Sequence, residues 1–247
     1  MADKKIEFSH HISRQFDQEL EEVRTNVLKM GGLVEQQLDL AMKALTQGDS
    51  DLGEQVARDD YKVNSLEVAI DEECSRILAK RSPTASDLRF VVTVIKTITD
   101  LERIGDEAEK IGYLAAGLAM AKQPKNRYRE IRNLGSHVKQ MVHSSLNAFA
   151  RLDADEAFEV AKRDVEVDEH YESILRQLIT FMMEDPRTIR PLLSVMWVAR
   201  ALERIGDHAK NICEYVIYLA HGKDVRHIGM QSHASLAEVE RKLDELD

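Results

Sequence analysis

Two identical acidic motifs contain the residues of this chain that are best suited to chemistry. The letters LERIGD occur twice, 101 residues apart, and each copy carries a glutamate and an aspartate at a spacing of four: Glu102 with Asp106, and Glu203 with Asp207. In an α-helix this spacing places both carboxylates on one side, one turn apart, where they repel each other. Each motif therefore indicates a place where a cation or a base has to compensate two acids.

A second pair of polar residues precedes each motif. Asp60 is followed by Asn64, and Asp164 is followed by Asp168. The first member of each pair falls within a 4,3,4,3 series of mostly apolar residues, which is the spacing of a helical packing seam. An acid at such a position is costly to bury, so it must be solvated, paired with a base or bound to a metal.

These eight side chains are candidate ligands for a divalent or trivalent metal ion. Ligands that are all oxygen favour Mg, Mn or Fe over a thiolate type of zinc site, although Zn remains open because the sequence does not identify the ion. The simpler interpretation is a solvated polar notch beside the bases of the same motifs. A single acidic pair would fit that interpretation, whereas duplication of both pairs weakens it and leaves metal binding as an equal alternative. The bases in question are Arg103, Lys110, Arg204 and Lys210.

Other candidate groups have weaker support. His208 stands beside Asp207 but has no counterpart in the first motif, so we expect a surface histidine. Cys74 falls within a packing seam and is expected to be a buried, inert thiol. The chain has no GxxxxGK segment and no arrangement that suggests nucleophilic catalysis, so we predict no catalytic residues, no nucleotide cofactor and no enzyme activity.

The elements that must position the acids are long helices. Sparse turn signals divide the chain into six helical segments of roughly 25 to 35 residues. Asp, Ser or Thr stands at the breaks, ready to cap the next helix, and Pro191 should fall in the first turn of the sixth helix. The breaks are expected near Gly48–Asp51, Ser82–Pro83, Gln123–Pro124, Leu152–Asp153 and Asp185–Pro186.

The second and third helices of each unit carry specific packing predictions. We expect the second helix to be continuous and to bury one seam from Val56 to Ile77. In the third helix, Leu88 and Ile95 should belong to a packing face that leads into Glu102, after which the apolar residues move to the opposite side. The acids would then replace part of a packing face.

The internal repeat extends well beyond the LERIGD letters. Matches at an offset of 104 residues connect Val56 with Val160 and Gly31 with Gly135, so each repeat comprises three helices. We therefore predict an all-α fold of two tandem three-helix bundles related by internal duplication. The expected domains are 1–122 and 123–222, followed by a polar C-terminal tail, 223–247, with a short amphipathic stretch over Ser235–Leu246.

Composition limits the partners and the location of the protein. The chain has 44 acidic and 34 basic residues, a formal net charge of −10, and no concentrated basic patch, which argues against nucleic acid as a partner. Two distant cysteines fit reduced thiols in the cytosol. The first residues lack the apolar core of a signal peptide, and the longest apolar run, Leu192–Ala199, is too short to insert into a membrane.

With its two LERIGD motifs, the PTASDLR segment at Pro83–Arg89 and the DxxVNxLE pattern from Asp60 to Glu67, the sequence resembles the PhoU family over nearly its whole length. The resemblance implies two three-helix bundles, each with an E(D)xxxD metal motif. It departs from an even duplication where Tyr171 replaces Glu67 and Lys210 replaces Glu109, so the two sites need not bind equally. The implied ligands are Glu102, Asp106, Asp60 and Asn64 in the first repeat and Glu203, Asp207, Asp164 and Asp168 in the second.

The same resemblance implies a regulatory role. PhoU-like proteins are understood as cytoplasmic negative regulators of phosphate uptake and of the phosphate regulon. They are expected to dock to a PstB-like transporter ATPase and a PhoR-like sensor kinase, and so to associate peripherally with membrane complexes. Long helical rods suit a docking protein, and a homodimer is expected.

Two alternatives remain from the sequence. A carboxylate-bridged metal-dependent oxidase would need paired Glu-x-x-His motifs, and the chain has one such motif, from Glu7 to His10. A metal-free helical scaffold is the other alternative.

Overall fold

The computed structural model describes residues 14–120, 129–222, 224, 225 and 236. Over these residues the chain forms helices and turns and no strand. The first half holds α1 (Arg14–Gln47), α2 (Ser50–Asp59), α3 (Tyr61–Arg81) and α4 (Ala85–Met120). The second half holds α5 (Arg129–Arg151), α6 (Ala154–Lys162), α7 (Asp164–Glu184), the short 3₁₀ turn η2 (Pro186–Thr188) and α8 (Ile189–His221).

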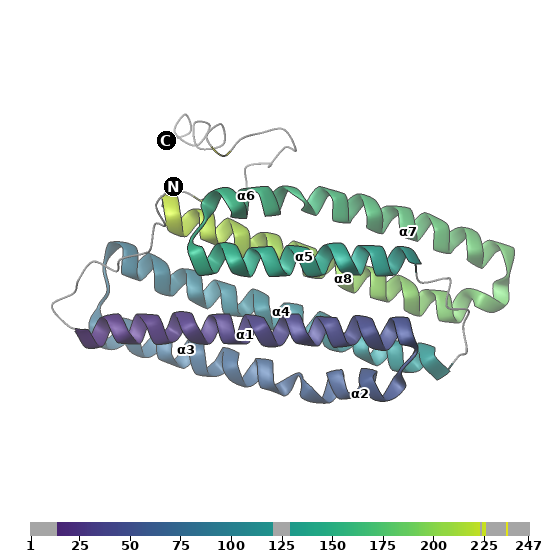
Figure 1. The fold of residues 1–247 in the computed structure, drawn as a ribbon, viewed down its shortest axis with the longest axis horizontal. Helices are drawn as coiled ribbons and strands as arrows, with labels where there is room; N and C mark the ends of the chain where they lie inside the picture. The colour runs from purple at the N-terminus through teal and green to yellow at the C-terminus, as the bar shows by residue number, and fades with distance from the viewer. Residues whose placement is uncertain (1–13, 121–128, 223, 226–235, 237–247) are drawn as a thin grey trace.

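The two halves repeat one arrangement, which confirms the predicted all-α duplication. In each half a long first helix, a divided second helix and a long third helix pack around a common apolar core (Figure 1). The predicted domain boundary after residue 122 lies outside the described residues. So do the Glu7–His10 motif and most of the predicted tail.

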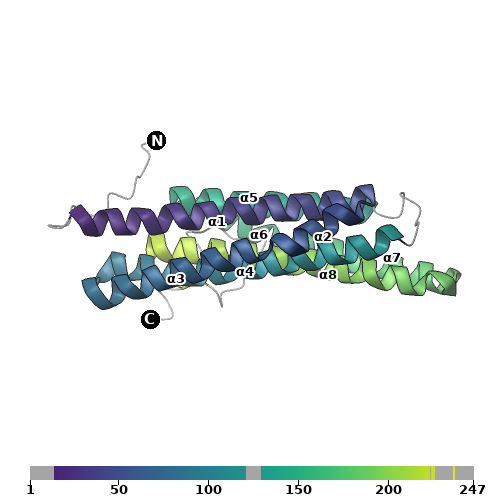
Figure 2. The same ribbon diagram turned by 90° about the horizontal axis from the view of Figure 1, so that it is seen from below.

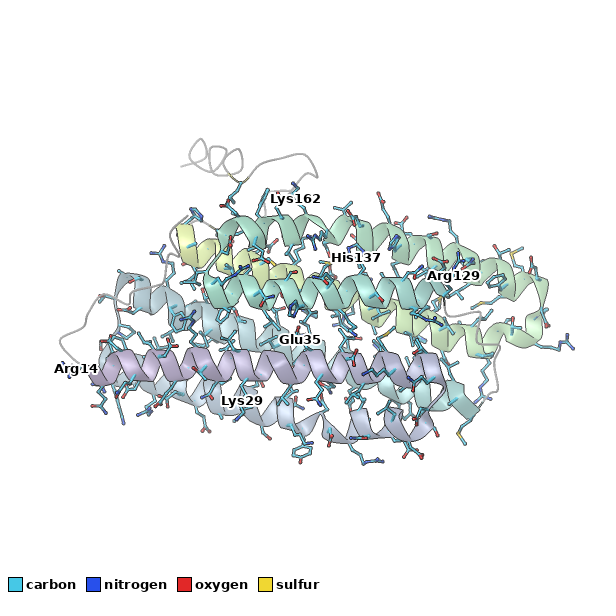
Figure 3. The ribbon with its side chains drawn as sticks, viewed as in Figure 1. Arg14, Lys29, Glu35, Arg129, His137 and Lys162 are labelled. Carbon is cyan, nitrogen blue, oxygen red and sulfur yellow. The ribbon has the colours of Figure 1, made fainter. Side chains whose placement is uncertain are left out.

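The side view separates the helices into two layers. Figure 2 shows α1 and α5 on one side and α3, α4, α8 and α7 on the other. The halves meet where α1 contacts α5 and where α4 contacts α8. Glu35 lies at the border between α1 and α5 (Figure 3), and its carboxylate is 2.7 Å from Nδ1 of His143. The third helices of the two repeats, α4 and α8, lie side by side in the layer that also holds α3 and α7.

The predicted helix breaks and caps are largely confirmed. Asp49 accepts a hydrogen bond from the Leu52 backbone N–H, and Asp153 accepts one from that of Glu156, so both aspartates cap the helices that follow them. Pro191 lies in the first turn of α8, where its missing N–H would have no partner within the helix. Within the described ranges, no helix has both the length and the apolarity needed to cross a membrane.

The prediction of a continuous second helix in each half is wrong. In the first half the helix is interrupted at Asp60, where the N–H of Val63 donates to the Asp60 carbonyl oxygen at 2.9 Å, a three-residue step. In the second half it is interrupted at Arg163, where the N–H of Glu166 makes the same step at 3.1 Å. Three-residue steps tighten a helix and change its direction. The buried acid of the seam stands at the bend in the first half, where it is Asp60, and directly after it in the second half, where it is Asp164.

The predicted change of packing face along the third helices is also wrong. The buried stripe of α4 runs from Phe90 through Ile98 and Leu101 to Leu118 without changing sides, because α1, α2 and α8 together cover a broad surface of this helix. Leu88 lies outside the stripe and is 41% exposed, as is its counterpart Ile189 on α8. The acids therefore continue an outer, partly apolar stripe and do not interrupt the core.

Candidate metal centre

Three carboxylates from two elements converge in the first half. Asp60 stands at the bend between α2 and α3, whereas Asp106 and Glu109 lie one helical turn apart on α4. One oxygen from each residue lies within 4.8 Å of the others, and Asp60 is buried. Within the described part of the chain, no base forms an ion pair with any of the three. This group has the residue types and spacing of a site for a hard cation, which prefers oxygen ligands.

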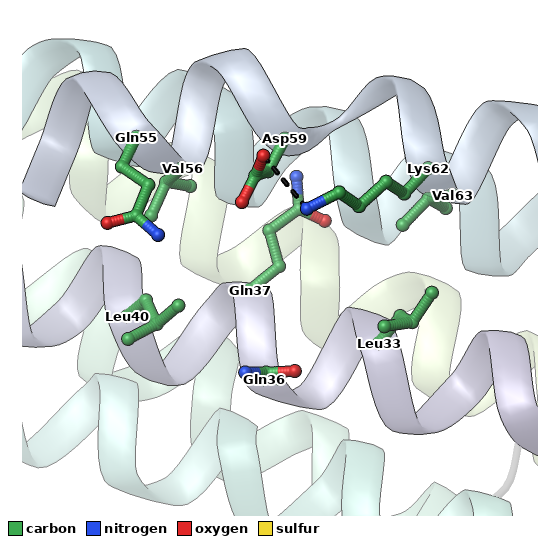
Figure 4. A pocket seen from close by; sticks show the side chains of 9 residues that line it. All are labelled: Leu33, Gln36, Gln37, Leu40, Gln55, Val56, Asp59, Lys62 and Val63. Atoms are coloured by element: carbon green, nitrogen blue, oxygen red, sulfur yellow. Dashed lines mark ion pairs between the residues drawn. The ribbon is translucent and has the colours of Figure 1, made fainter.

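Asp60 is held in place by two side-chain amides. Gln37 on α1 donates from Nε2 to Oδ1 of Asp60 at 2.8 Å, and Asn64 donates from Nδ2 to Oδ2 at 2.9 Å. Figure 4 shows the Gln37 side chain reaching from α1 toward the bend, beside the ion pair of Asp59 and Lys62. Among the residues that the structure describes, neither Oε1 of Gln37 nor Oδ1 of Asn64 has a hydrogen-bond partner. Two neutral oxygens therefore remain next to a fixed carboxylate.

The absence of a side chain at Gly105 makes room for these oxygens. A Cβ atom built at Gly105 would lie 3.3 Å from both Oδ1 of Asp60 and Oε1 of Gln37. Contacts that close are tighter than ordinary packing allows without movement. The glycine of the first LERIGD motif thus lets the oxygen atoms of α1 and of the bend approach α4.

Burial and mutual repulsion disfavour ionisation of the first acids. Burial, followed by the charge of Asp60, raises the pKa of both Asp106 and Glu109 above the usual carboxyl range. For Glu102, burial and then the charge of Asp106 raise the pKa. Glu67 on α3 is raised by burial and then by Asp71. A bound cation would stabilise the ionised form of all four acids.

Glu102 stands near this centre but outside its tight group. Its pKa is affected by Asp106, Glu67 and Asp60, so these charges are neighbours. Its oxygens do not belong to the three-carboxylate group, whereas those of Glu109 do. The sequence prediction named Glu102 and Asn64 as ligands and did not include Glu109 or Gln37. The missed signal for Glu109 was its position three residues after Asp106, on the same side of α4.

The second half places its acids beside bases. Nζ of Lys210 on α8 lies 2.7 Å from Oδ2 of Asp164, which is 2% exposed. Arg200 pairs with Glu203 from one turn earlier on α8. Asp168 and Asp207 lie close enough to Asp164 that, after burial, its charge is the next largest cause of their raised pKa values.

Lys210 remains charged in this environment. Burial lowers the pKa of its ammonium group, but the hydrogen bond and the negative charge of Asp164 outweigh that effect, so the pKa is raised overall. No three carboxylates converge in the second half as they do in the first, judged over the residues that the structure describes. The four acids predicted for the second site lie near one another, and the ammonium group of Lys210 lies beside Asp164.

His208 does not lie on the surface as the sequence analysis expected. Its side chain is largely buried between α8 and α4, where Nδ1 lies 2.7 Å from Oδ1 of Asp100. The expectation failed because it considered His208 only beside Asp207 on its own helix. The buried acid that it contacts comes from the other half of the molecule.

Fold and site together define a class of protein: a duplicated helical bundle with a carboxylate cluster and buried, unreactive thiols. Burial raises the pKa of Cys74 to about 12, so its nucleophilic thiolate form is disfavoured. These features agree with comparisons against known proteins. A family model described as "PhoU domain" matches residues 27–115 and 131–216, one match in each half.

Several characterised relatives match nearly the full length of the chain. A phosphate-specific transport system accessory protein PhoU homolog from Pseudomonas putida is 53% identical, over 92% of this chain and 89% of the relative. The phosphate-specific transport system accessory protein PhoU of Escherichia coli K12 is 50% identical, over 91% of this chain and 92% of its own.

Solved structures agree with the sequence relatives. The crystal structure of PhoU from Pseudomonas aeruginosa matches with a TM-score of 0.82 at 52% identity, covering 85% of this chain and all of that one. A phosphate transport system regulatory protein PhoU from Streptococcus pneumoniae matches with a TM-score of 0.79 at 31% identity, covering 85% of this chain and 99% of the other. The chain belongs to the PhoU family, and its relatives are described as accessory and regulatory proteins of phosphate transport systems.

Proposed function

We propose that this protein is a cytoplasmic negative regulator of phosphate uptake and of phosphate-regulon signalling. It acts by docking to the ATPase of the phosphate ABC transporter and to the phosphate-responsive sensor kinase. The observation that carries this proposal is the near full-length similarity to accessory proteins of phosphate-specific transport systems, at 53% and 50% identity. Similarity of this extent covers both repeats and leaves little of the chain for an unrelated function.

The outer side of α8 supports a docking role. Trp197 is 52% exposed and lies on the same side of α8 as Leu193 and Ile189, which are also exposed. Lys110 of α4 places its ammonium 5.7 Å from the centre of the Trp197 ring. Large aromatic residues are favoured as anchors in protein interfaces. We propose that this stripe contacts a partner, whose basic groups would complement the acidic charge of the chain.

The first carboxylate cluster is proposed as the metal centre. Asp60, Asp106 and Glu109 would hold the ion, and the amide oxygens of Gln37 and Asn64 are candidates for further ligands, because both amides are hydrogen-bonded to Asp60. A Mg, Mn, Fe or Zn ion there would neutralise the acids and tie the α2–α3 bend to α4. Its role would be structural or regulatory. Self-association into a homodimer is also part of the proposal.

A pull-down from cells grown in high and low phosphate tests the docking role. We expect the tagged full-length chain to recover the transporter ATPase and the sensor kinase, and Trp197→Ala to recover markedly less of at least one. His143→Ala is the matched control, because His143 is also exposed but lies on α5, in the other layer. Recovery of neither partner under either condition would contradict the regulatory assignment.

Metal analysis separates the proposal from its alternatives. After chelation and reconstitution, Asp106→Ala should lose bound ion, and Glu102→Ala will show whether that residue contributes. Unchanged ion content in the Asp106 variant would show that Asp106 is not a ligand, whereas an unaltered chain that binds no ion would favour the metal-free scaffold. The carboxylate oxidase is disfavoured because the converging group contains no histidine. Iron-loaded protein should consume no oxygen.

A further inference from the structure

We propose that the ammonium group of Lys210 occupies the cation position of the second acidic cluster, so that this cluster takes up no metal ion. The inference rests on the metal-binding part of the proposed function and extends it. It makes the two halves of a duplicated protein different in kind, because one depends on an external ion and the other carries its own positive charge.

The repeat itself identifies the exchange. Lys210 is the counterpart of Glu109 at the 101-residue offset, and Asp164 is the counterpart of Asp60 at the 104-residue offset. In the first half the α4 residue at this position adds a third carboxylate to the group. In the second half the α8 residue brings its Nζ atom to 2.7 Å from the equivalent aspartate. One position on the third helix therefore carries opposite charges in the two halves.

Electrostatics then disfavour a second ion. Asp164 is 2% exposed, so a charge placed beside it is poorly screened by water. A divalent cation approaching Asp164 would be repelled by the Lys210 ammonium at hydrogen-bond distance. It would also have to displace a side chain that is covalently attached to α8 and therefore always present. The Arg200–Glu203 ion pair occupies another of the acids that the motif offers.

The neutral ligands of the first half are also changed. Gln37, which is 7% exposed and has a free Oε1 atom beside Asp60, corresponds to the buried apolar residue Met141 in the second half. Over the described part of the chain, Oδ1 of Asp164 and Oε2 of Glu203 also lack hydrogen-bond partners. Each of these belongs to a carboxylate whose other oxygen is already paired with a base. In the first half, by contrast, no base among the described residues forms an ion pair with the three-carboxylate group.

The test measures how much Mn²⁺ the chelator-treated, full-length protein binds. Equilibrium dialysis and electron paramagnetic resonance give this amount. We expect Asp207→Asn to bind as much Mn²⁺ as the unaltered chain. We expect Lys210→Glu, which restores the acid of the first half, to roughly double the bound Mn²⁺ by completing a second carboxylate group. Lys80→Glu is the matched control for charge, because Lys80 is exposed near the end of α3, far along the helix from Asp60.

The outcomes separate this inference from the metal proposal. If Asp207→Asn loses Mn²⁺, the second cluster already binds ions and the role of Lys210 is wrong. If Lys210→Glu gains no more Mn²⁺ than Lys80→Glu, the inference is equally overturned. An unaltered chain that binds no Mn²⁺, together with a Lys210→Glu variant that does, would refute the first metal centre and support Lys210 as the resident cation. Circular dichroism of each variant checks that it is folded.

Discussion

The Nδ1 atom of His208 lies 2.7 Å from Oδ1 of Asp100, and this contact joins α8 to α4 where the two halves meet. Asn211 donates to the same oxygen at 3.1 Å, and Asp100 is buried. A short distance along the same pair of helices, Arg204 of α8 pairs with Glu107 of α4. Polar contacts thus tie α4 to α8 at two positions along the junction between the halves.

Replacing Asp100 with Asn should weaken the junction between the halves. The substitution removes the buried charge that faces His208 and Asn211, so we expect a loss of about 1–3 kcal/mol in the free energy of unfolding. Urea denaturation followed by circular dichroism measures the change. Asp71→Asn, at an exposed position on α3, is the control and should have little effect. Equal stabilities for the two variants would show that the Asp100 contacts are not a net stabilising feature.

Gly53 of α2 should not tolerate alanine. A Cβ atom at this position would lie 2.5 Å from the carbonyl oxygen of Gly112 on α4, so the two helices would have to separate. Overpacking of this kind typically costs about 1–3 kcal/mol. A Cβ atom at Gly117 on α4 has no described neighbour within 4 Å apart from its own helix, so Gly117→Ala should be neutral or stabilising by about 0.5–1 kcal/mol, because alanine favours helices. Thermal melts of both variants test the contrast, and a Gly53→Ala protein as stable as Gly117→Ala would contradict it.

Arg81 should contribute to stability through Glu19. Its Nε and Nη2 atoms donate to the two carboxylate oxygens of Glu19 at 2.9 and 2.8 Å, joining the end of α3 to α1. Because Glu19 is largely buried, we expect Arg81→Met to cost about 1–2 kcal/mol in chemical denaturation. Arg58→Met breaks an exposed pair with Glu54 and should cost less than about 0.5 kcal/mol. Similar losses in both would argue against a special role for the two-bond geometry.

The metal-free protein should show a pH dependence that comes from the first cluster. The pKa of Glu109 is raised in the folded protein, by burial and then by Asp60, so the folded state binds more protons than the unfolded state above the usual carboxyl pKa. Its contribution is therefore most favourable at low pH and is lost as the pH rises through the folded pKa.

Comparison with Glu109→Gln isolates this effect from other acids, such as Glu19, whose pKa is lowered. In the presence of chelator, the stability of the unaltered protein relative to the variant should fall as the pH rises through the folded-state pKa of Glu109. Saturating metal should reverse the trend. Urea midpoints measured across the pH range provide the test, with Glu72→Gln, exposed on α3, as the control. A constant difference between the unaltered protein and Glu109→Gln would show that Glu109 has no altered ionisation.

Much of the fold could be predicted because the signals are local and occur twice. The duplicated LERIGD letters and the two offsets define the repeat, and Asp49 and Asp153 mark helix starts by capping chemistry. The seam series correctly placed Val56 and Ile77 in the core. These features depend on helical periodicity and on free N–H groups, which a sequence displays directly.

The remaining features depend on contacts between distant segments. The bend at Asp60 and its amide partner Gln37 require α1 to lie against the α2–α3 junction, and spacing within one helix does not reveal this. Leu88 is exposed because α1, α2 and α8 cover the other sides of α4. The sequence shows that Lys210 replaces Glu109, but only the structure places its ammonium group at Asp164. Metal binding by the predicted acids stays a prediction.

The packing of α4 against α8 has a consequence for synthesis on the ribosome. The buried surface of α4 is complete only after α8, the last long helix of the described chain, has emerged. A nascent chain that ends after the first repeat would lack α8, so the side of α4 that carries Asp100 and Glu107, both buried in the finished protein, would be uncovered. Truncated products of this chain should therefore be recognised by chaperones or proteases, and the two repeats should fold as one cooperative unit.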